Sequence, residues 1–479
     1  MALEPPWPRP LPYTANVIKR LARGWRSWFA LLNEWDFRIA IGKLNLLGLP
    51  VFLVNDPQLL KQLLVSDVER FPKHPYTLWI LEPLIGRAIF SVNGCEWQRQ
   101  RKLLDQAFKQ AELRKVFPGM LAATEAMLQR LKQEPKHAVV DVETEMTMVT
   151  ADVIVRTILS RPLQEGEAQE IFAAFSRYQR RAARALVLRL LRLPKSIVQR
   201  SLKRDAHQIR NWIAPLIHER LEQHLQTPYR ESQDLLDCLI EARDPDTETS
   251  FSEQELVDQI CFLFLAGHET SASALATACW LLALDQDAQA RIRQEVEDVD
   301  TSVGPESLRQ MPFSMAVFQE TLRLYPPVSF FIRERDGMPT ELRRIDPNKK
   351  GQQAERQSKE IHRCPVGALM LISPWVIHRH EQHWPQPQEF RPERFLDSEA
   401  TTLDQQMARE AWLPYGLGSR KCPGAAFAQQ EALLVLAGLV KHYRLLPMEG
   451  QQPVWLGRLT LRSLNGVRLK TERLEKNKI

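Results

Sequence analysis

The chain has 479 residues, of which 44% are hydrophobic, so it is long enough to bury a large core. Its 64 basic and 58 acidic residues leave a net charge of +6, which fits an acidic protein partner and gives no reason to expect nucleic-acid binding. The proline-rich, basic N-terminus lacks the apolar run of a signal peptide, and no apolar segment reaches membrane-spanning length. We expect a soluble, cytoplasmic protein, with peripheral membrane contact left open.

The cysteines point to a reducing compartment. None of their spacings matches a zinc motif, a redox motif or a compact disulfide framework, so we expect at most one cysteine to carry chemistry. The six are Cys95, Cys238, Cys261, Cys279, Cys364 and Cys422.

The hydrophobic pattern predicts a mainly helical chain up to Pro326. Residues 37–55 read as two strands joined by a glycine turn, and helical periodicity begins after Asp56-Pro57. Helices are expected at 57–66, 95–109, 112–133, 145–160, 166–192, 196–226, 253–284, 286–299 and 313–325.

The pattern changes after Pro326-Pro327, where short strand-like pieces such as VSFFIR and ALMLIS appear. The polar, charged segment 336–363 predicts an exposed loop or an extended hairpin. A long helix is expected from Cys422 to about His442, and the alternating tail 458–473, with its Asn-Gly pair, predicts a final hairpin. The expected fold class is therefore α+β, mainly helical with a smaller β-rich part.

Cys422 lies in the stretch YGLGSRKCPG, residues 415–424. Pro423 fits the first position of the following helix, whose free amides would then face the Cys422 sulfur and stabilise a thiolate, the form that binds metals. Arg420 supplies a cation for an acidic group on a bound molecule. The alternative is a buried structural cysteine beside a glycine turn. Three glycines let the backbone pass close to a flat, bulky group: Gly416, Gly418 and Gly424.

Three further patterns lie upstream of the cysteine. In FLFLAGHETSASA, Gly267 weakens an apolar helix, and the Thr270 hydroxyl can bond back to the carbonyl of Ala266. In FQETLRLYPP, Glu320 and Arg323 share one helical face. GCEWQRQRKLLDQAF likewise places Trp97 and Arg101 on one face, where indole and guanidinium groups are both donors.

Together, in this order, the four motifs resemble those of the cytochrome P450 family. The glycine-rich stretch is similar to the family's haem-binding loop and departs from it at Tyr415, where the family usually has Phe. The likeness runs from about residue 30 to the end. It implies a single P450 domain over 1–479, with 1–30 as an N-terminal extension without a membrane anchor and 336–363 as the charged loop. It also implies that the oxygen-binding helix and the cysteine-ligand helix sandwich the haem.

The resemblance implies roles for the motif residues. Cys422 would be the axial ligand of haem b, with Ala266 and Gly267 against the cofactor. Thr270 would contact dioxygen, and Glu269 would help relay protons. Trp97, Arg101 and Arg420 would bind the haem propionates, with Arg333 as a further partner and Arg335 as the competing choice. Glu320, Arg323 and Arg394 (of FRPERF) would form a structural triad.

The activity implied is a monooxygenase of soluble bacterial type that activates O2 with two externally supplied electrons. It would hydroxylate or epoxidise an apolar small molecule, such as a fatty acid, terpenoid, steroid or polyketide. The electron donor would be a separate ferredoxin or flavodoxin-like protein with its reductase, attracted by Arg420 and Lys421. Candidate pocket residues are Tyr76, Leu78, Trp79, Phe262, Leu263, Ala266, Ser329, Phe330, Phe331 and Leu459.

Three other functions compete with this one. A peroxide-using or electron-independent haem-thiolate enzyme predicts loss of the Glu269–Thr270 pair, which is present. A non-enzymatic haem sensor has no need of that pair. A zinc hydrolase would use HRHEQH (378–383), but its H-E-x-H spacing does not match the helical zinc motif.

The arginine-rich run from Arg177 to Arg210 also has two interpretations. A solvated helical face is the commoner one. By resemblance the run covers the substrate entrance, where it would touch a lipid surface or attract a carboxylate-bearing substrate.

Overall fold

The computed structural model describes most of the chain. The described residues are 3–15, 20, 23–24, 26–46, 48–190, 193–227, 231–337, 340–344 and 360–475. No described helix is both long and apolar enough to cross a membrane.

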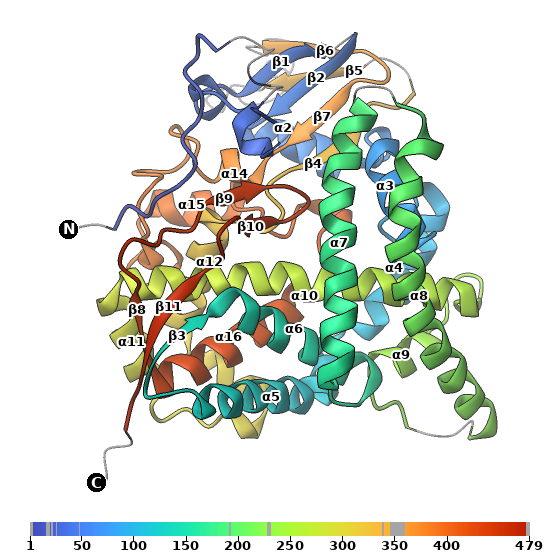
Figure 1. Cartoon of the computed structure of the whole chain (residues 1–479). Coiled ribbons are helices and arrows are strands. Elements are labelled where there is room, and N and C mark those ends of the chain that lie inside the picture. The colour runs from blue at the N-terminus through green and yellow to red at the C-terminus, as the bar shows by residue number, and fades with distance from the viewer. Residues whose placement is uncertain are drawn as a thin grey trace.

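Helices make up most of the molecule, and α10 runs through its middle (Figure 1). A capping box between Ser252 and Glu255 starts α10, and Asp285 ends it and caps the next helix. Most helix bounds agree with the sequence prediction to within three residues, whereas α3, α9, α14 and α15 were not predicted. The α-helices are α2 (Pro57–Lys61), α3 (Pro75–Ile85), α4 (Gly94–Ala107), α5 (Gln110–Gln133), α6 (Val142–Leu159), α7 (Glu165–Leu190), α8 (Lys195–Gln226), α9 (Leu235–Glu241), α10 (Glu253–Leu284), α11 (Gln286–Val296), α12 (Pro312–Leu324), α14 (Pro374–Ile377), α15 (Thr402–Glu410) and α16 (Ala425–His442).

The largest sheet has the strand order β1-β2-β7-β4 and lies at the end of the molecule that is at the top of Figure 1. β1 (Ile41–Leu46) and β2 (Leu49–Val54) are antiparallel, as the glycine turn at Gly48 predicted. β7 (Leu369–Ile372) pairs in parallel with β2, and β4 (Phe331–Glu334) pairs antiparallel with β7. The segment that follows α12 is thereby brought beside the N-terminal strands.

The C-terminal tail does not form the predicted hairpin at Asn465-Gly466. β10 (Leu461–Ser463) pairs with β9 (Trp455–Gly457), which precedes it, while β11 (Arg468–Arg473) lies between β3 (His137–Asp141) and β8 (Tyr443–Pro447). Alternation and the Asn-Gly pair were correct signals for strands and a turn. The two strands separate because each has a better partner elsewhere.

The charged segment 336–363 begins and ends as a strand pair. β5 (Thr340–Arg344) and β6 (Glu360–Cys364) are antiparallel. Residues 345–359, which hold half of its charged residues, lie outside the described residues.

Close packing of α6 against α10 fixes the middle of the fold. A side chain at Gly267 would lie 2.5 Å from the Ile154 Cδ1 atom of α6. The Thr150 hydroxyl of α6 donates to the carbonyl of His268 on α10 at 2.9 Å. α10 remains one continuous helix, so Gly267 serves the approach of α6 and does not break the helix.

Candidate functional site

A large, mainly apolar cavity of about 980 Å³ separates α10 from the loop that precedes α16. Cys422 lines one side of it, and Ala266, Gly267, Glu269 and Thr270 of α10 line another. The structure thus brings the cysteine motif and the Gly-x-Glu-Thr motif to one space, although about 150 residues separate them in the chain.

The cysteine loop is held by glycine conformations and backbone hydrogen bonds. Gly416 and Gly418 both have positive φ, and the Cys422 N–H donates to the carbonyl of Tyr415 at 2.8 Å. A side chain at Gly418 would lie 2.2 Å from the Leu64 carbonyl oxygen. Only glycine fits there, so the loop can pass under the cavity with the Cys422 side chain exposed to it.

The start of α16 differs from the sequence prediction. The helix begins at Ala425 with Gly424 as its N-cap, so Pro423 is not its first residue. Burial raises the pKa of the Cys422 thiol, whereas a hydrogen bond from the Gly424 amide and the nearby Arg101 guanidinium lower it. One amide and one guanidinium therefore favour the thiolate, and desolvation opposes it.

Three cations meet at one side of the cavity: the buried Lys73 and the half-buried Arg333 and Arg420. Burial lowers the pKa of Arg333 to about 9, with Arg420 as the second cause. Burial, Arg420 and Arg333 together lower the pKa of Lys73 well below its usual range. Within the part of the chain that the structure describes, the Nε atoms of Arg333 and Arg420 are buried without a hydrogen-bond acceptor. Such a cluster is costly unless an anion lies between its members.

Trp97 and Arg101 also line the cavity, from α4. The Arg420 guanidinium lies over the Trp97 ring, 5.3 Å from its centroid. Arg101 donates to the carboxylate of Asp105 and to the carbonyl of Lys421, so it clamps the cysteine loop. Arg335 does not line the cavity; it donates to the Arg70 carbonyl instead.

Thr270 and Glu269 face the cavity from α10 with different partners. The Thr270 hydroxyl donates to the Ala266 carbonyl at 2.6 Å, as the sequence predicted. Glu269 is buried, and its Oε1 accepts from Nε of Arg462 on β10 at 3.2 Å. Arg462 also donates to Glu143 of α6 at 3.2 Å, so the acid on α10 is tied through the C-terminal tail to a second acid nearer the surface.

Several of the predicted pocket residues line the cavity, and two do not. Trp79 lies outside the lining, with the Lys195 ammonium over its ring at 5.8 Å. Ser329 turns away and donates to the Pro326 carbonyl. The Tyr76 side chain is outside the described part. The predicted residues that do line the cavity are Leu78, Phe262, Leu263, Ala266, Phe330, Phe331 and Leu459.

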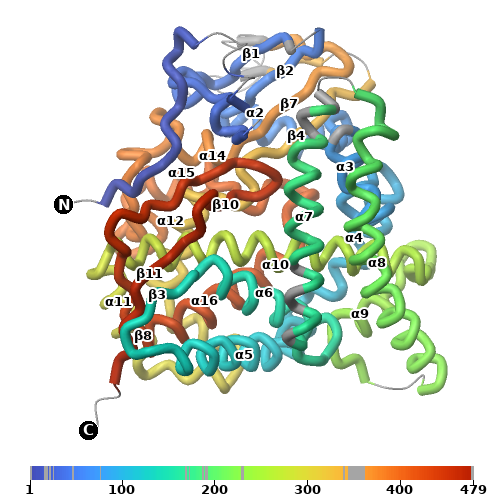
Figure 2. The backbone as a smooth tube through the Cα atoms, in the orientation of Figure 1, coloured from blue at the N-terminus to red at the C-terminus, as the bar shows by residue number. Residues whose placement is uncertain are grey.

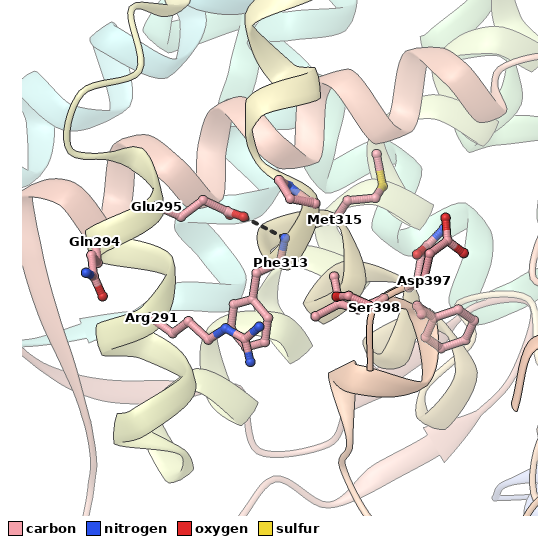
Figure 3. Close-up of a pocket in the computed structure, with 11 residues that line it drawn as sticks. Arg291, Gln294, Glu295, Phe313, Met315, Asp397 and Ser398 are labelled. Atoms are coloured by element: carbon pink, nitrogen blue, oxygen red, sulfur yellow. Dashed lines mark hydrogen bonds between the residues drawn. The ribbon is translucent and has the colours of Figure 1, made fainter. Parts of the chain in front are cut away.

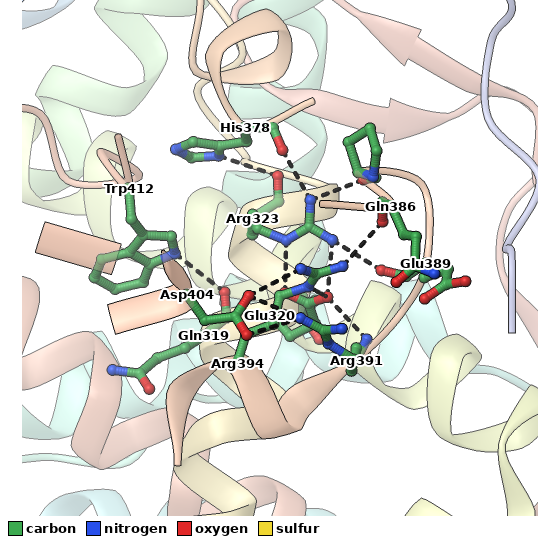
Figure 4. Close-up of polar contacts among 12 residues, drawn as sticks. Gln319, Glu320, Arg323, His378, Gln386, Glu389, Arg391, Arg394, Asp404 and Trp412 are labelled. Carbon is green, nitrogen blue, oxygen red and sulfur yellow. Dashed lines mark hydrogen bonds and ion pairs between the residues drawn. The ribbon is translucent and has the colours of Figure 1, made fainter. Parts of the chain in front are cut away.

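Glu320 of α12 is the centre of a buried ionic network (Figure 4). Its carboxylate accepts from Nε and Nη2 of Arg323 at 2.6 and 2.8 Å, and it lies 3.5 Å from Nε of Arg394. All three side chains are fully buried. Asp404, which the sequence did not single out, pairs with Arg394 at 3.1 Å and so supplies a second carboxylate.

The histidines of HRHEQH do not converge on a metal site. His378 lies between the Arg323 carbonyl and the Leu413 N–H. His380 and His383 stack on each other and hydrogen-bond to the carbonyls of Ile39 and Asn55, which flank β1 and β2. The described residues contain no group of three or more potential ligands that could hold a metal ion. The zinc-hydrolase hypothesis therefore gains no support from them.

A second pocket, of about 670 Å³, shares no residue with the cavity (Figure 3). Two of its charged groups have partners: Glu295 accepts from the first amides of α12, and Arg291 lies over the Phe313 ring at 3.9 Å and pairs with Glu399. The third, Asp397, is exposed to solvent. With these groups engaged, the pocket offers no evident chemistry.

Sequence reasoning missed several residues of the main cavity and its surroundings. Lys73 and Arg462 lie in no recognisable motif, and only the fold brings them to the site. Glu431 of α16 is buried, and burial raises its pKa to about 8 against a hydrogen bond with Ser271 of α10. The sequence signal that could have identified Glu431 is its position as a single acid in the apolar run AQQEALLVL.

The cavity fits haem in three respects. It offers one accessible thiol, a glycine loop that passes close beneath it, and buried guanidiniums that need an anion, as the two carboxylates of a porphyrin would supply. Soft thiolate and carboxylate-binding cations are the donor set that such a cofactor requires.

Comparison with known proteins agrees with this geometry. The cytochrome P450 family matches residues 5–345 and 360–463. The chain is 29% identical over 403 residues to cyclooctatin synthase of Streptomyces melanosporofaciens, a match that covers 84% of this chain and 82% of that protein. It is 27% identical over 444 residues to taurochenodeoxycholic 6 alpha-hydroxylase of Sus scrofa, covering 88% and 82%.

A solved structure, the heme domain of cytochrome P450DA, has a TM-score of 0.74 and 21% identity, and the match covers 91% of this chain and 90% of that one. At this identity the likeness shows the fold, and it confirms the predicted α+β class. The family match spans nearly the whole chain and confirms the resemblance read from the motifs. The chain therefore belongs to the cytochrome P450 family of haem-thiolate monooxygenases.

Proposed function

We propose that the protein binds haem b through the Cys422 thiolate and inserts one oxygen atom from O2 into an apolar small molecule. The observation that carries the proposal is the placement of Cys422, the unpaired cations and Thr270 around one apolar cavity. When held by this thiolate, haem would supply the chemistry that cleaves the O–O bond.

The residues around the cavity divide the remaining tasks. Arg333, Arg420 and Lys73 bind the two cofactor carboxylates and fix its orientation, while Trp97 packs beneath Arg420. Arg101 steadies the cysteine loop through the Lys421 carbonyl. The apolar walls exclude water so that the reactive site meets only its substrate.

Thr270 and Glu269 handle protons. The Thr270 hydroxyl is assigned to contact with oxygen. In the structure this hydroxyl donates to the Ala266 carbonyl. Oε1 of Glu269 accepts from Arg462, whereas its Oε2 is buried without a hydrogen-bond partner among the described residues, and we assign this oxygen to the proton relay. The Glu269–Thr270 pair favours oxygen activation over the peroxide-dependent alternative.

We propose a separate acidic electron donor that docks on the Cys422 side. Lys421 and Lys109 are exposed there. Arg420 lines the cavity, so we assign it to cofactor binding, the first of the two roles expected from the sequence, and leave docking to Lys421. All six cysteines are free in the structure. The reducing, cytoplasmic compartment is proposed from their spacing in the sequence. A single P450 domain over the whole chain remains our proposal.

The direct test is the absorption spectrum of the reduced protein with carbon monoxide. A red-shifted Soret band is expected in the wild type and is expected to be lost in Cys422→Ser. Thr270→Ala is expected to keep the band but to divert electrons from product to peroxide. A wild-type protein without the band, or a Thr270→Ala variant with unchanged coupling, would contradict the proposal.

A further inference from the structure

The arginines of α7 fall on two faces of the helix. Arg177 and Arg181, four residues apart, both pair with the buried Asp205 of α8, at 3.2 and 2.6 Å. These two join α7 to α8. Arg180 and Arg184, also four apart, are exposed on the neighbouring face and take no part in that pairing.

The second face lies beside the turn between β9 and β10. In Figures 1 and 2 the tip of this hairpin reaches toward α7, and Arg458 is its first residue after β9. Arg458 is half-buried, and burial lowers its pKa, which Arg184 and Arg180 lower further. Three guanidiniums thus approach one another. None of the three has an ion-pair partner among the residues that the structure describes.

The same two elements line the large cavity. Leu459 and Thr460, which follow Arg458, form part of its wall, and so does Gln179, which precedes Arg180. The walls beyond them are apolar and include Leu78, Phe262 and Leu263. The three arginines therefore stand at the rim of an apolar space and not on a remote surface.

Three neighbouring positive charges without a counterion raise the free energy of the folded protein, and an anion that binds them relieves this cost. Guanidinium groups bind planar carboxylates through paired hydrogen bonds. A ligand with a carboxylate at one end and a long apolar body would satisfy both the rim and the wall at once.

We propose that this arginine cluster (Arg180, Arg184 and Arg458) binds the carboxylate of an amphiphilic organic acid whose apolar body extends into the cavity. The inference rests on the proposed function and narrows its substrate class. Anchoring one end of the chain fixes which carbon reaches the reactive site, so the cluster determines regiochemistry as well as affinity.

The test compares dodecanoic acid with dodecan-1-ol, which has the same apolar body without the charge. The holoprotein is titrated with each, and binding is read from the Soret shift of the ferric protein and, independently, from equilibrium dialysis. The acid is expected to bind about tenfold more tightly than the alcohol, and the advantage should shrink as salt rises.

Variants assign the preference to the cluster. Arg184→Gln/Arg458→Gln is expected to bring the acid down to the affinity of the alcohol and leave the alcohol unchanged, whereas Arg458→Lys keeps part of the preference. Arg204→Gln, which removes an exposed arginine from α8, is the matched control and should keep the full preference. An unchanged acid-to-alcohol ratio in the double variant, or no binding of the acid to the wild type, would overturn the inference.

Two further outcomes separate the hypotheses. If the double variant loses binding to phosphatidylglycerol vesicles but keeps its acid preference, the cluster is a lipid-surface contact and the inference is wrong. Dialysis does not require thiolate ligation, so a lost carbon-monoxide band with retained acid preference refutes the proposed function alone. If the acid and the alcohol bind equally and the carbon-monoxide band is normal, the role of the arginine cluster is refuted and the proposed function stands.

Discussion

Replacing Glu320 by glutamine tests whether the buried ionic network stabilises the fold. The change keeps the size of the side chain but removes its charge, which leaves Arg323 and Arg394 fully buried. Removing one partner of a buried ion pair costs about 3–5 kcal/mol. Arg323 keeps three backbone carbonyls as acceptors and Arg394 keeps Asp404, so the lower end, about 3 kcal/mol, is expected.

The free energy of unfolding is measured by urea denaturation of the holoprotein, followed by circular dichroism. Since domains are stable by about 5–15 kcal/mol, a loss of this size is readily measured. Glu393→Gln is the control, because Glu393 is partly exposed and pairs only with the exposed Arg291; its expected cost is below about 1 kcal/mol. A loss below about 1 kcal/mol in Glu320→Gln would refute the view that this carboxylate neutralises both arginines.

Three other predictions follow from the site. Burial and Arg323 lower the pKa of His378 to about 3, against about 6.5 unfolded; its contribution to stability is complete above pH 6.5 and should fall by about 2 kcal/mol between pH 7 and pH 5. His378→Asn should therefore flatten the pH dependence of the unfolding midpoint, and an unchanged slope would contradict this. Gly418→Ala should lower the free energy of unfolding by more than about 2 kcal/mol and impair haem retention. Gly450 has the same positive φ but open space around it, so Gly450→Ala measures the backbone strain alone, about 1 kcal/mol. If calorimetry shows equal losses of stability in the two variants, the clash with Leu64 is refuted. Arg333→Met removes a buried cation, so the haem-free protein should unfold at a higher temperature while haem affinity, measured by titration, falls; a change of both in the same direction would count against the cation cluster.

The helices could be predicted because their apolar period is local. α10 was predicted with its observed bounds, since a capping box and a long apolar run mark it. Strand partners could not be predicted in the same way. The Asn-Gly pair favours a hairpin, but β11 lies between β8 and β3, and β3 is more than 300 residues away in sequence.

The same contrast holds for the site. Cys422, Thr270 and Glu320 lie in short motifs with fixed spacing, so the sequence identified them. Lys73 and Arg462 stand alone among ordinary neighbours, and their importance comes from what the folded chain places beside them. Arg420 was expected both to bind the cofactor and to attract the electron donor, and its place in the cavity lining agrees with the first of these roles.

The pairing of Glu269 with Arg462 makes the acid of α10 depend on a strand almost two hundred residues later in the chain. During synthesis, α10 emerges from the ribosome long before its counterion. Until β10 folds into place, Glu269 must stay hydrated, because a buried carboxylate without a partner is unstable. Water can therefore leave the interior around Glu269 only late in folding, after β10 has folded into place.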